Sequence, residues 1–586
     1  MSSNKEAEYF SDGLTEEIIN ALGKIQELQV TSRTSSFTFK NSTYKISEIG
    51  EKLNVSIILE GSVRLSGTTA RISVQLIETK SEFQFWSDSF DRNLDNIFEV
   101  QDEISLNIAD KLRENIGHFN LDEHLVDSYN VSFETYKNYL KGRFYLMKLD
   151  YSNTTKAITI FEEVIAESPD FPLPYLDINQ GYTYMGTMGI IPAFEGFKKA
   201  QPFIEKAIQL KEDLPETQLN LAWISFWQNW DSEKAYQHLN RALSLKATDP
   251  MYLTMANFLT IEGKLDLAAK YVEKALELAP FSSVNINYKG FLHYLSGRYS
   301  EALPFFKRSL NIQPELPFPV VNIGACHLLL GDSEEALAYF SNLPDDNTGF
   351  LAKLGGITIT HAVIGNKTKA YQGITELESY LNTSSVGNAI NFLILAHAQL
   401  NNFKTAIDYI KMGIDNQFPL VLLLPTEPLA SPLHDLPEFK KLIAGILDTS
   451  KHLEPNKKES YYKKELFTAQ EIELYKSRLK ELMENENLYL NPELTLRSLA
   501  NYMNLSPNHM SQLLNKGINK NFSDFLNTYR LENFKLKLKN SNAHKLTILA
   551  LAYDSGFNSK TVFNTFFKKK MGMTPKAYLK QISSDL

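Results

Sequence analysis

The feature that most constrains the fold is a repeat with a period near 34 residues, which runs from about Tyr136 to Ile414. An alanine recurs once in each copy, at Ala157, Ala200, Ala235, Ala268, Ala302, Ala336, Ala370 and Ala406. The intervals between these alanines are 33 to 36 residues, apart from the first, which is 43. A unit of this length holds two short helices and cannot bury its apolar face alone, so neighbouring units must stack. The sequence therefore predicts a helical array across the middle of the chain.

Glycines at fixed offsets support this interpretation. Gly290 and Gly324 lie twelve residues before their alanines, where two helices must approach closely, and Gly263, Gly297 and Gly331 lie five before, at the turn between helices. The clearest copy, residues 290–314, resembles a tetratricopeptide repeat. The resemblance implies about eight units in a right-handed superhelix. The long first interval predicts an insertion around Met185–Phe197, and the segment Glu427–Leu442 is expected to cap the array.

Arrays of this kind bind extended or helical segments of other proteins on the concave face, which the first helix of each unit lines. The candidate groove residues are Asn220, Asn257, Asn287 and Phe291. Packing between repeats is the alternative role for side chains on these helices, and the aromatics at helical spacing, such as Tyr271, Phe305 and Phe340, are expected to pack. A protein or peptide is therefore the partner expected for the array.

Two helix-turn-helix patterns follow in tandem, at Leu496–Leu514 and Thr547–Lys568. Each has a short amphipathic helix, a turn residue that tolerates positive φ, and a serine that can cap the second helix. The turn residue and the serine are Asn504 with Ser506 in the first unit and Gly556 with Ser559 in the second. A second helix held in this way can lie in the major groove of DNA.

Residues 470–582 resemble the DNA-binding domain of AraC-type transcriptional regulators. The most specific parts are Gly556–Ser559 with Phe563, Phe567–Lys570, and Met571–Tyr578. The resemblance implies two recognition helices joined by a linker helix at about Ser523–Leu538. The first unit departs from the pattern, because residues 515–522 replace a more basic stretch that contains glycine. We therefore expect this unit to hold DNA phosphates more weakly.

Helical spacing separates core residues from residues that face DNA. The predicted core comprises Met510, Leu513 and Leu514 in the first unit and Phe563 and Phe567 in the second. The residues expected to face the groove are Asn508, Ser511 and Gln512 in the first unit and Lys560, Thr561, Asn564 and Thr565 in the second. Asparagine and glutamine can pair bidentately with adenine. Lys568, Lys569 and Lys570 are expected to contact phosphates. Two roles stay open: Arg530 contacts DNA or forms an internal salt bridge, and His509 touches DNA or packs inward.

The charge of the chain is divided in a way that fits a DNA-binding tail. Residues 460–586 carry a net charge of +8, whereas the rest of the chain carries −17. A chain that presents its basic end alone to nucleic acid would show this asymmetry. The acidic body is also expected to compete with DNA for the basic tail at low ionic strength. Solvation of Lys-rich helices is the alternative explanation.

The first 118 residues predict an α/β domain. Helices are expected at Asp12–Lys24, Ile46–Leu53 and Leu94–Ile116, and strands at Leu28–Ser32, Val55–Leu65, Ala70–Glu78 and Phe83–Phe90. Ser66-Gly67 would form the hairpin turn between two of these strands. Asp12-Gly13 is expected to start the first helix, with Asp12 as its N-cap. A phosphate site at that helix start is the alternative.

This region resembles the TolB-like domain in residues 8–17, 34–37, 59–63 and 86–92. Such domains commonly precede tetratricopeptide arrays in bacterial regulators and nucleotide cyclases. The family's first buried strand has no counterpart after Met1. We therefore expect either a start upstream of Met1 or a sheet that lacks one member.

Signatures of several other protein classes are missing from the sequence. There is no phosphate-binding glycine loop, His-Glu-x-x-His pair or Gly-x-Ser-x-Gly elbow, so we expect no enzyme activity, cofactor or metal. Cys326 is the single cysteine, which excludes an internal disulfide. No apolar run is long enough to cross a membrane and no signal peptide is apparent, so we expect a cytoplasmic protein.

Together these features predict a mainly α chain with four parts: a TolB-like α/β domain at 1–118, a tetratricopeptide α-solenoid with its cap at 133–447, a linker at 448–467, and an all-α double helix-turn-helix domain at 468–586. The predicted function is sequence-specific transcriptional regulation in a bacterium. The tail would bind double-stranded promoter DNA, and the array would receive a protein or peptide signal. Homodimerisation stays open. The alternative is a protein-interaction scaffold whose helix-turn-helix pair does not bind DNA specifically.

Overall fold

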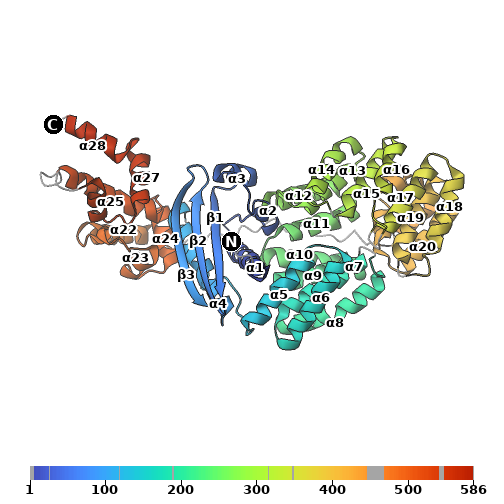
Figure 1. Ribbon diagram of the computed structural model, residues 1–586, viewed down its shortest axis with the longest axis horizontal. Coiled ribbons are helices and arrows are strands. Elements are labelled where there is room, and N and C mark those ends of the chain that lie inside the picture. The colour runs from blue at the N-terminus through green and yellow to red at the C-terminus, as the bar shows by residue number, and fades with distance from the viewer. Residues whose placement is uncertain are drawn as a thin grey trace. The chain divides into compact units, whose positions relative to one another are not determined.

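The computed structural model describes residues 5–25, 27–117, 119–187, 190–314, 316–345, 349–383, 385–444, 446, 467–539 and 547–584 (Figure 1). The chain forms two compact units, each built from separate stretches of sequence. Unit 1 comprises residues 1–19, 30–44 and 129–456, and unit 2 comprises residues 20–29, 45–128 and 457–586. The fold is mainly α, as the sequence predicts.

Helix pairs make up most of unit 1 (Figure 1). The pairs are α5 (Phe133–Leu146) with α6 (Tyr151–Glu167), α7 (Pro172–Thr187) with α8 (Ala193–Lys211), α9 (Pro215–Trp223) and its π-helical extension η1 (Ile224–Gln228) with α10 (Ser232–Leu245), α11 (Asp249–Ile261) with α12 (Leu265–Leu278), α13 (Ser283–Leu295) with α14 (Tyr299–Ile312), α15 (Pro317–Leu329) with α16 (Ser333–Ser341), α17 (Phe350–Val363) with α18 (Lys367–Glu378), and α19 (Val386–Gln399) with α20 (Phe403–Asp415).

The alanines that recur in the sequence lie on the second helix of each pair, and all eight are buried with at most 2% of their surface exposed. The glycines perform the two roles predicted for them. A Cβ atom on Gly290 would lie 2.8 Å from Phe306, and one on Gly324 would lie 2.8 Å from Phe340. Gly263, Gly297 and Gly331 have φ values of +74°, +74° and +87°, which the turn between helices requires.

The segment after α20 folds back against the first helices of the array. It contains the 3-10 helices η2 (Pro419–Leu423) and η3 (Pro428–Leu433), followed by α21 (Pro437–Ala444). Leu422 belongs to the same hydrophobic cluster as Phe226 and Met255, which lie on η1 and α11. The segment therefore caps the array and also occupies the surface that the first helices present.

A buried hydrogen bond fixes this segment to the middle of the array. The Tyr294 hydroxyl on α13 donates to Glu427 Oε1 at 2.5 Å, and Glu427 also accepts the Leu429 N–H at 3.1 Å. On α19, the Gln399 side-chain amide donates to the Leu429 carbonyl at 2.6 Å. Burial raises the pKa of Glu427, although both of its hydrogen bonds favour the ionised form.

The N-terminal part of unit 1 differs from the sequence prediction. Helix α1 (Lys5–Leu22) begins before Asp12, so Asp12 lies inside the helix, and both the N-cap and the phosphate-site interpretations are wrong. Asp12 instead accepts a hydrogen bond from Lys40 at 2.6 Å. Gly13 allows close packing on α5, because a Cβ atom there would lie 2.4 Å from Leu140.

The strand predicted at Leu28–Ser32 is also absent among the described residues of that segment. The apolar and polar residues of the segment alternate, but its backbone pairs with no neighbouring strand there. Ser32 donates its backbone N–H to the Leu278 carbonyl at 2.8 Å and caps the short helix α2 (Arg33–Phe37).

In unit 2, three strands form an antiparallel sheet in the order β1 (Ile57–Ser66), β2 (Thr69–Glu78), β3 (Phe83–Asn93). The β1–β2 hairpin turns at Gly67, where φ is +60°. The helix α3 (Ile46–Leu53) precedes the sheet, and α4 (Ile97–Ile116) follows it. The three strands and two helices confirm the predicted elements of this segment.

The C-terminal part of unit 2 contains both predicted helix-turn-helix units. The first comprises α22 (Ala469–Glu484), η5 (Leu488–Leu490), α23 (Leu496–Tyr502), α24 (Pro507–Gln512) and the π-helix η6 (Leu513–Gly517). The second comprises α26 (Ile548–Asp554), α27 (Lys560–Met571) and α28 (Pro575–Ser584), and α25 (Phe522–Lys539) joins the two. Of the linker predicted at 448–467, all but Phe467 lies outside the described residues. Among the described helices, none has the length and apolar character needed to cross a membrane.

The close helix contact at Gly290 gives a stability prediction. We expect Gly290→Ala to lower the free energy of unfolding by about 1–3 kcal/mol, because the new methyl group must displace Phe306. Gly387→Ala is the matched control, since a Cβ atom there meets Phe418 at an ordinary 3.4 Å and alanine favours a helix. Chemical denaturation of both variants checks this, and equal stabilities would contradict tight packing at Gly290.

The buried Glu427 gives a prediction about pH. A carboxyl whose pKa is raised in the folded protein holds its proton at pH values where the unfolded chain has released it, so its contribution to stability falls as pH rises through and above the ordinary glutamate range. Glu427→Gln keeps a hydrogen-bonding side chain and removes the charge. We expect the melting temperature of this variant, relative to wild type, to increase between pH 4.5 and pH 8. Glu334→Gln, at an exposed position, should show no such trend. A constant difference for Glu427→Gln would contradict the burial of its charge.

Candidate nucleic-acid interface

Local sequence explains how each recognition helix begins. Ser506 accepts the His509 N–H at 3.2 Å and so caps α24, and Ser559 accepts the Thr561 N–H at 3.2 Å and caps α27. The turns before them have positive φ values, +53° at Asn504 and +94° at Gly556, as the sequence predicts.

The apolar faces of both helices are buried as predicted. Met510, Leu513 and Leu514 are fully buried in a cluster that also contains residues of α22, α23 and α25. Phe563 and Phe567 are buried in a separate cluster with Phe534 of α25. Each helix-turn-helix unit therefore has its own hydrophobic core, and α25 contributes to both.

The second recognition helix presents the predicted side chains outward. Lys560, Thr561 and Asn564 on α27 are exposed, and Thr565 is half-buried. The lysines at 568–570, at the end of the same helix, are also exposed, and Lys569 lies 3.1 Å from the Asp524 carboxylate. The chemistry of this face, with amide, hydroxyl and ammonium groups, suits contact with base edges and phosphates.

The first recognition helix differs from the prediction. We expected Asn508, Ser511 and Gln512 to face outward, but Ser511 is 1% exposed and Gln512 is 5% exposed. Asn508 is half-buried, and its side-chain amide is already hydrogen-bonded within unit 2. For Asn508 the physical reason is a contact between segments far apart in sequence, because Arg113 at the end of α4 and Leu121 after it bind its side chain.

Four residues of α4 make these contacts. Arg113 Nη1 donates to Asn508 Oδ1 at 2.5 Å, and Arg497 Nη2 donates to Asp110 at 3.0 Å. The Leu496 N–H donates to Glu114 at 3.0 Å. Asn115 accepts from Asn521 through its backbone carbonyl at 2.7 Å and from Ser523 through its side chain at 2.9 Å. The sequence contains no local pattern that reveals these pairs, since their members are more than 380 residues apart.

Two roles that the sequence left open are resolved by geometry. Arg530 is 4% exposed and donates to the backbone carbonyls of Tyr489 and Asn491 at 2.8 and 2.7 Å, so it holds α25 to the first unit and forms neither of the expected contacts. Burial lowers the pKa of Arg530 to about 10, so the guanidinium stays charged at neutral pH. His509 packs edge-on against Phe467 and lies 2.6 Å from the Ser506 hydroxyl.

The candidate groove residues of the array are partly engaged within the array itself. Phe291 stacks on Tyr294 with ring centroids 6.0 Å apart, and Asn287 accepts a hydrogen bond from Asn322 at 3.4 Å. Asn220 donates to the Leu176 backbone carbonyl at 3.5 Å, whereas the side-chain oxygen Oδ1 of Asn257 is buried with no hydrogen-bond partner. Contact between these four residues and another protein stays a prediction.

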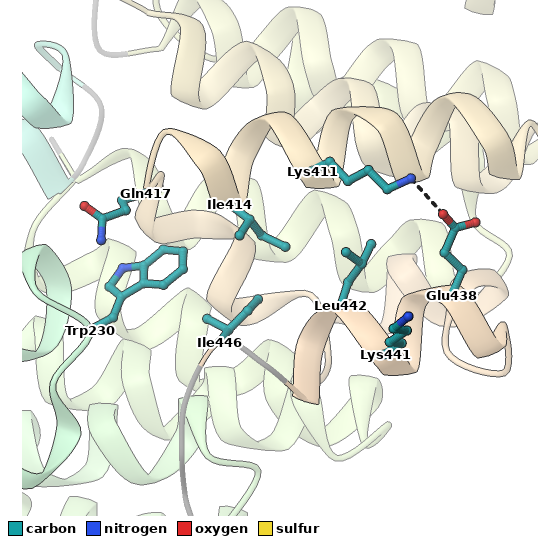
Figure 2. Close-up of a pocket in the computed structure, with 8 residues that line it drawn as sticks. All are labelled: Trp230, Lys411, Ile414, Gln417, Glu438, Lys441, Leu442 and Ile446. Atoms are coloured by element: carbon teal, nitrogen blue, oxygen red, sulfur yellow. Dashed lines mark hydrogen bonds and ion pairs between the residues drawn. The ribbon is translucent and has the colours of Figure 1, made fainter.

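A cavity of about 580 Å³ lies where the cap meets the third helix pair (Figure 2). Its apolar lining comprises Trp230, Ile414, Leu442 and Ile446, and its polar lining comprises Lys411, Gln417, Glu438 and Lys441. Lys411 Nζ lies 2.7 Å from Glu438 Oε1, across one side of the cavity in Figure 2. An apolar lining with a few charged groups suits an apolar side chain from another molecule.

Comparisons with known proteins agree with the two main architectures. A helix-turn-helix domain model matches residues 499–581, and a tetratricopeptide repeat model matches residues 250–282. The chain therefore contains a helix-turn-helix domain of the AraC type near its C-terminal end and a tetratricopeptide repeat in its middle.

Similar proteins match over short parts of the chain. A putative adenylate cyclase 3 of Rhizobium meliloti (strain 1021) is 42% identical over 113 residues, which is 19% of either chain. An uncharacterized HTH-type transcriptional regulator of Staphylococcus aureus (strain MSSA476) is 34% identical over 91 residues, which is 16% of this chain and 12% of the relative. The chain thus spans a fifth or less of the length of these relatives.

Solved structures resemble the chain at low identity. A human IFIT1 dimer with PPP-AAAA aligns with a TM-score of 0.38 and 14% identity, covering 58% of this chain and 78% of that one. Pseudomonas aeruginosa pilF aligns with a TM-score of 0.27 and 15% identity, covering 37% of this chain and 94% of that one.

Proposed function

We propose that this chain is a bacterial, cytoplasmic transcriptional regulator that binds promoter DNA sequence-specifically through its C-terminal domain. The observation that carries the proposal is the outward face of α27. Its core residues Phe563 and Phe567 are buried, while Lys560, Thr561 and Asn564 are exposed on the same helix. The lysines at 568–570 extend this face with positive charge.

The first helix-turn-helix unit contributes less to this proposal. Asn508 could read adenine, but its amide is engaged by Arg113 and Leu121. Ser511 and Gln512 remain candidate DNA contacts that would require the covering residues to leave. This burial favours the second candidate function, a scaffold whose helix-turn-helix pair does not bind DNA specifically.

We also propose that the array receives a protein or peptide signal and that the partner inserts an apolar side chain into the cavity beside Trp230. The cap already occupies part of the first-helix surface, whereas this cavity is open and lined by apolar groups. A photo-crosslinking residue at Lys441 should capture a specific protein in cells, and one at the exposed Lys367 should not. Identical products from both positions would contradict this site.

We propose a TolB-like fold for the N-terminal α/β segment. The proposal rests on the residues that carry this resemblance, at 8–17, 34–37, 59–63 and 86–92. The antiparallel sheet of this segment and the helix α4 are compatible with the proposal.

Substitutions on α27 separate base reading from phosphate contact. We expect Asn564→Ala to weaken binding to the preferred site by about 1–3 kcal/mol and to relax the preference at one base pair. The reason is that a lost bidentate contact removes the discrimination between bases at that position. Lys568→Ala should weaken binding to all sequences alike. Since one phosphate contact is lost, the slope of the logarithm of affinity against the logarithm of salt concentration should become shallower by about one.

The measurement uses the full chain and begins with selection of preferred sites from a random duplex library at low salt. The variants are then titrated against single-base mutants of the selected site, with Lys367→Ala on α18 as a control. Failure to enrich any sequence would favour the scaffold. A uniform effect of Asn564→Ala across the panel would show that this residue does not read bases.

A further inference from the structure

The contact between α4 and the first helix-turn-helix unit uses the groups that this unit would offer to DNA. The Asn508 side chain is the clearest case. Its Oδ1 accepts from Arg113 Nη1 at 2.5 Å and from the Leu121 N–H at 3.3 Å, while its Nδ2 donates to the Leu121 carbonyl at 3.3 Å. An asparagine reads adenine with the same oxygen and the same amide nitrogen. Asn508 therefore cannot keep these bonds and read a base at the same time.

Charged groups reinforce the contact. Asp110 on α4 accepts from Arg113 at 2.7 Å and from Arg497 at 3.0 Å, so one carboxylate joins two cations, one from each side of the interface. Arg497 is exposed, and a cation beside a recognition helix commonly contacts a phosphate. Here it contacts a carboxylate of the same chain, which carries the charge sign of a phosphate.

Burial shows that the contact is closely packed. The Arg113 side chain is 1% exposed, although arginine is almost never fully buried unless it is paired. Its partners are Asp110 on its own helix and Asn508 on the recognition helix. Ser511 and Gln512, one turn further along the same recognition helix, are buried as well. A DNA duplex cannot reach the Asn508 side chain while α4 and Leu121 stay in place.

We propose that the end of α4 and DNA compete for the same face of the first helix-turn-helix unit, so that the N-terminal segment of unit 2 keeps this half of the reader closed. The proposal rests on the proposed DNA-binding function. The second recognition helix carries exposed groove residues, so the closed state leaves that half available. DNA bound across both helix-turn-helix units must displace Arg113 and Asp110. The equilibrium between closed and open states therefore lowers the apparent affinity for DNA.

A reversible cross-link tests the competition directly. Ser523 Oγ lies 2.9 Å from Asn115 Oδ1, so the double variant Asn115→Cys, Ser523→Cys places two thiols close to each other across the contact. The native Cys326 is buried, and burial raises the pKa of its thiol to about 12, so it should not interfere. We expect the full chain to form the cross-link under mild oxidation. If the cross-link does not form, the closed arrangement is overturned, and this result does not depend on whether the chain binds DNA.

DNA titrations of the oxidised and reduced forms provide the second readout. The oxidised double variant should bind its selected site about tenfold or more weakly than the reduced form, because the open state is removed. Ser523→Cys alone, treated identically, controls for oxidation. Equal affinities in the oxidised and reduced double variant would overturn competition while leaving the proposed DNA binding intact.

A charge reversal tests release in the opposite direction. Asp110→Lys places a cation beside Arg113 and Arg497 and should increase affinity for the selected site severalfold. Glu99→Lys, at an exposed position on the same helix, makes the same change in charge and controls for general attraction to DNA. Equal gains from both variants would overturn the proposal. No DNA binding by any form, including the reduced chain and Asp110→Lys, would instead reject the proposed function on which the inference rests.

Discussion

The arrangement of unit 2 depends on one buried cation. The guanidinium of Arg113 leaves water almost completely, and burial lowers its pKa, yet an arginine stays charged at neutral pH. A buried charge without partners would cost several kcal/mol, so the surrounding groups must supply hydrogen bonds. Asp110 supplies a countercharge and Asn508 supplies an amide oxygen. The position of α4 against the first helix-turn-helix unit follows from this requirement, and the burial of Ser511 and Gln512 accompanies it.

Patterns that repeat within short windows could be predicted from the sequence with good precision. The eight recurring alanines are all buried, and the glycines at the two offsets have the packing and the positive φ values expected of them. The N-cap serines, the helix-turn-helix cores and the three strands also match. In each case the determining interaction joins residues within one or two neighbouring elements, so its signature lies in the local spacing of residue types.

Interactions between distant segments could not be predicted in the same way. Nothing in the sequence near Asn508 indicates that its amide oxygen accepts a hydrogen bond from Arg113, almost 400 residues earlier. The strand expected at Leu28–Ser32 is missing because Ser32 pairs with a carbonyl of the array, and alternation of apolar residues gives no information about such a partner. Likewise the sequence presents Glu427 as an ordinary polar residue of a capping segment, although its carboxylate is buried and accepts a hydrogen bond from Tyr294. The residues expected to face DNA in the first unit were therefore placed correctly on their helix but wrongly with respect to solvent.

The length of α25 has a consequence for how much of a genome the reader can distinguish. Its 18 residues extend about 27 Å at 1.5 Å per residue, about four-fifths of the 34 Å turn of B-form DNA, so two open recognition helices could reach successive major grooves on one face of the duplex. With the first helix covered, the remaining helix would read roughly half as many base pairs. Each base pair that is no longer read multiplies the number of matching sites by about four, and competing sites in a genome already number in the millions. Movement of α4 would then change where the protein resides along the chromosome as well as how tightly it is held there.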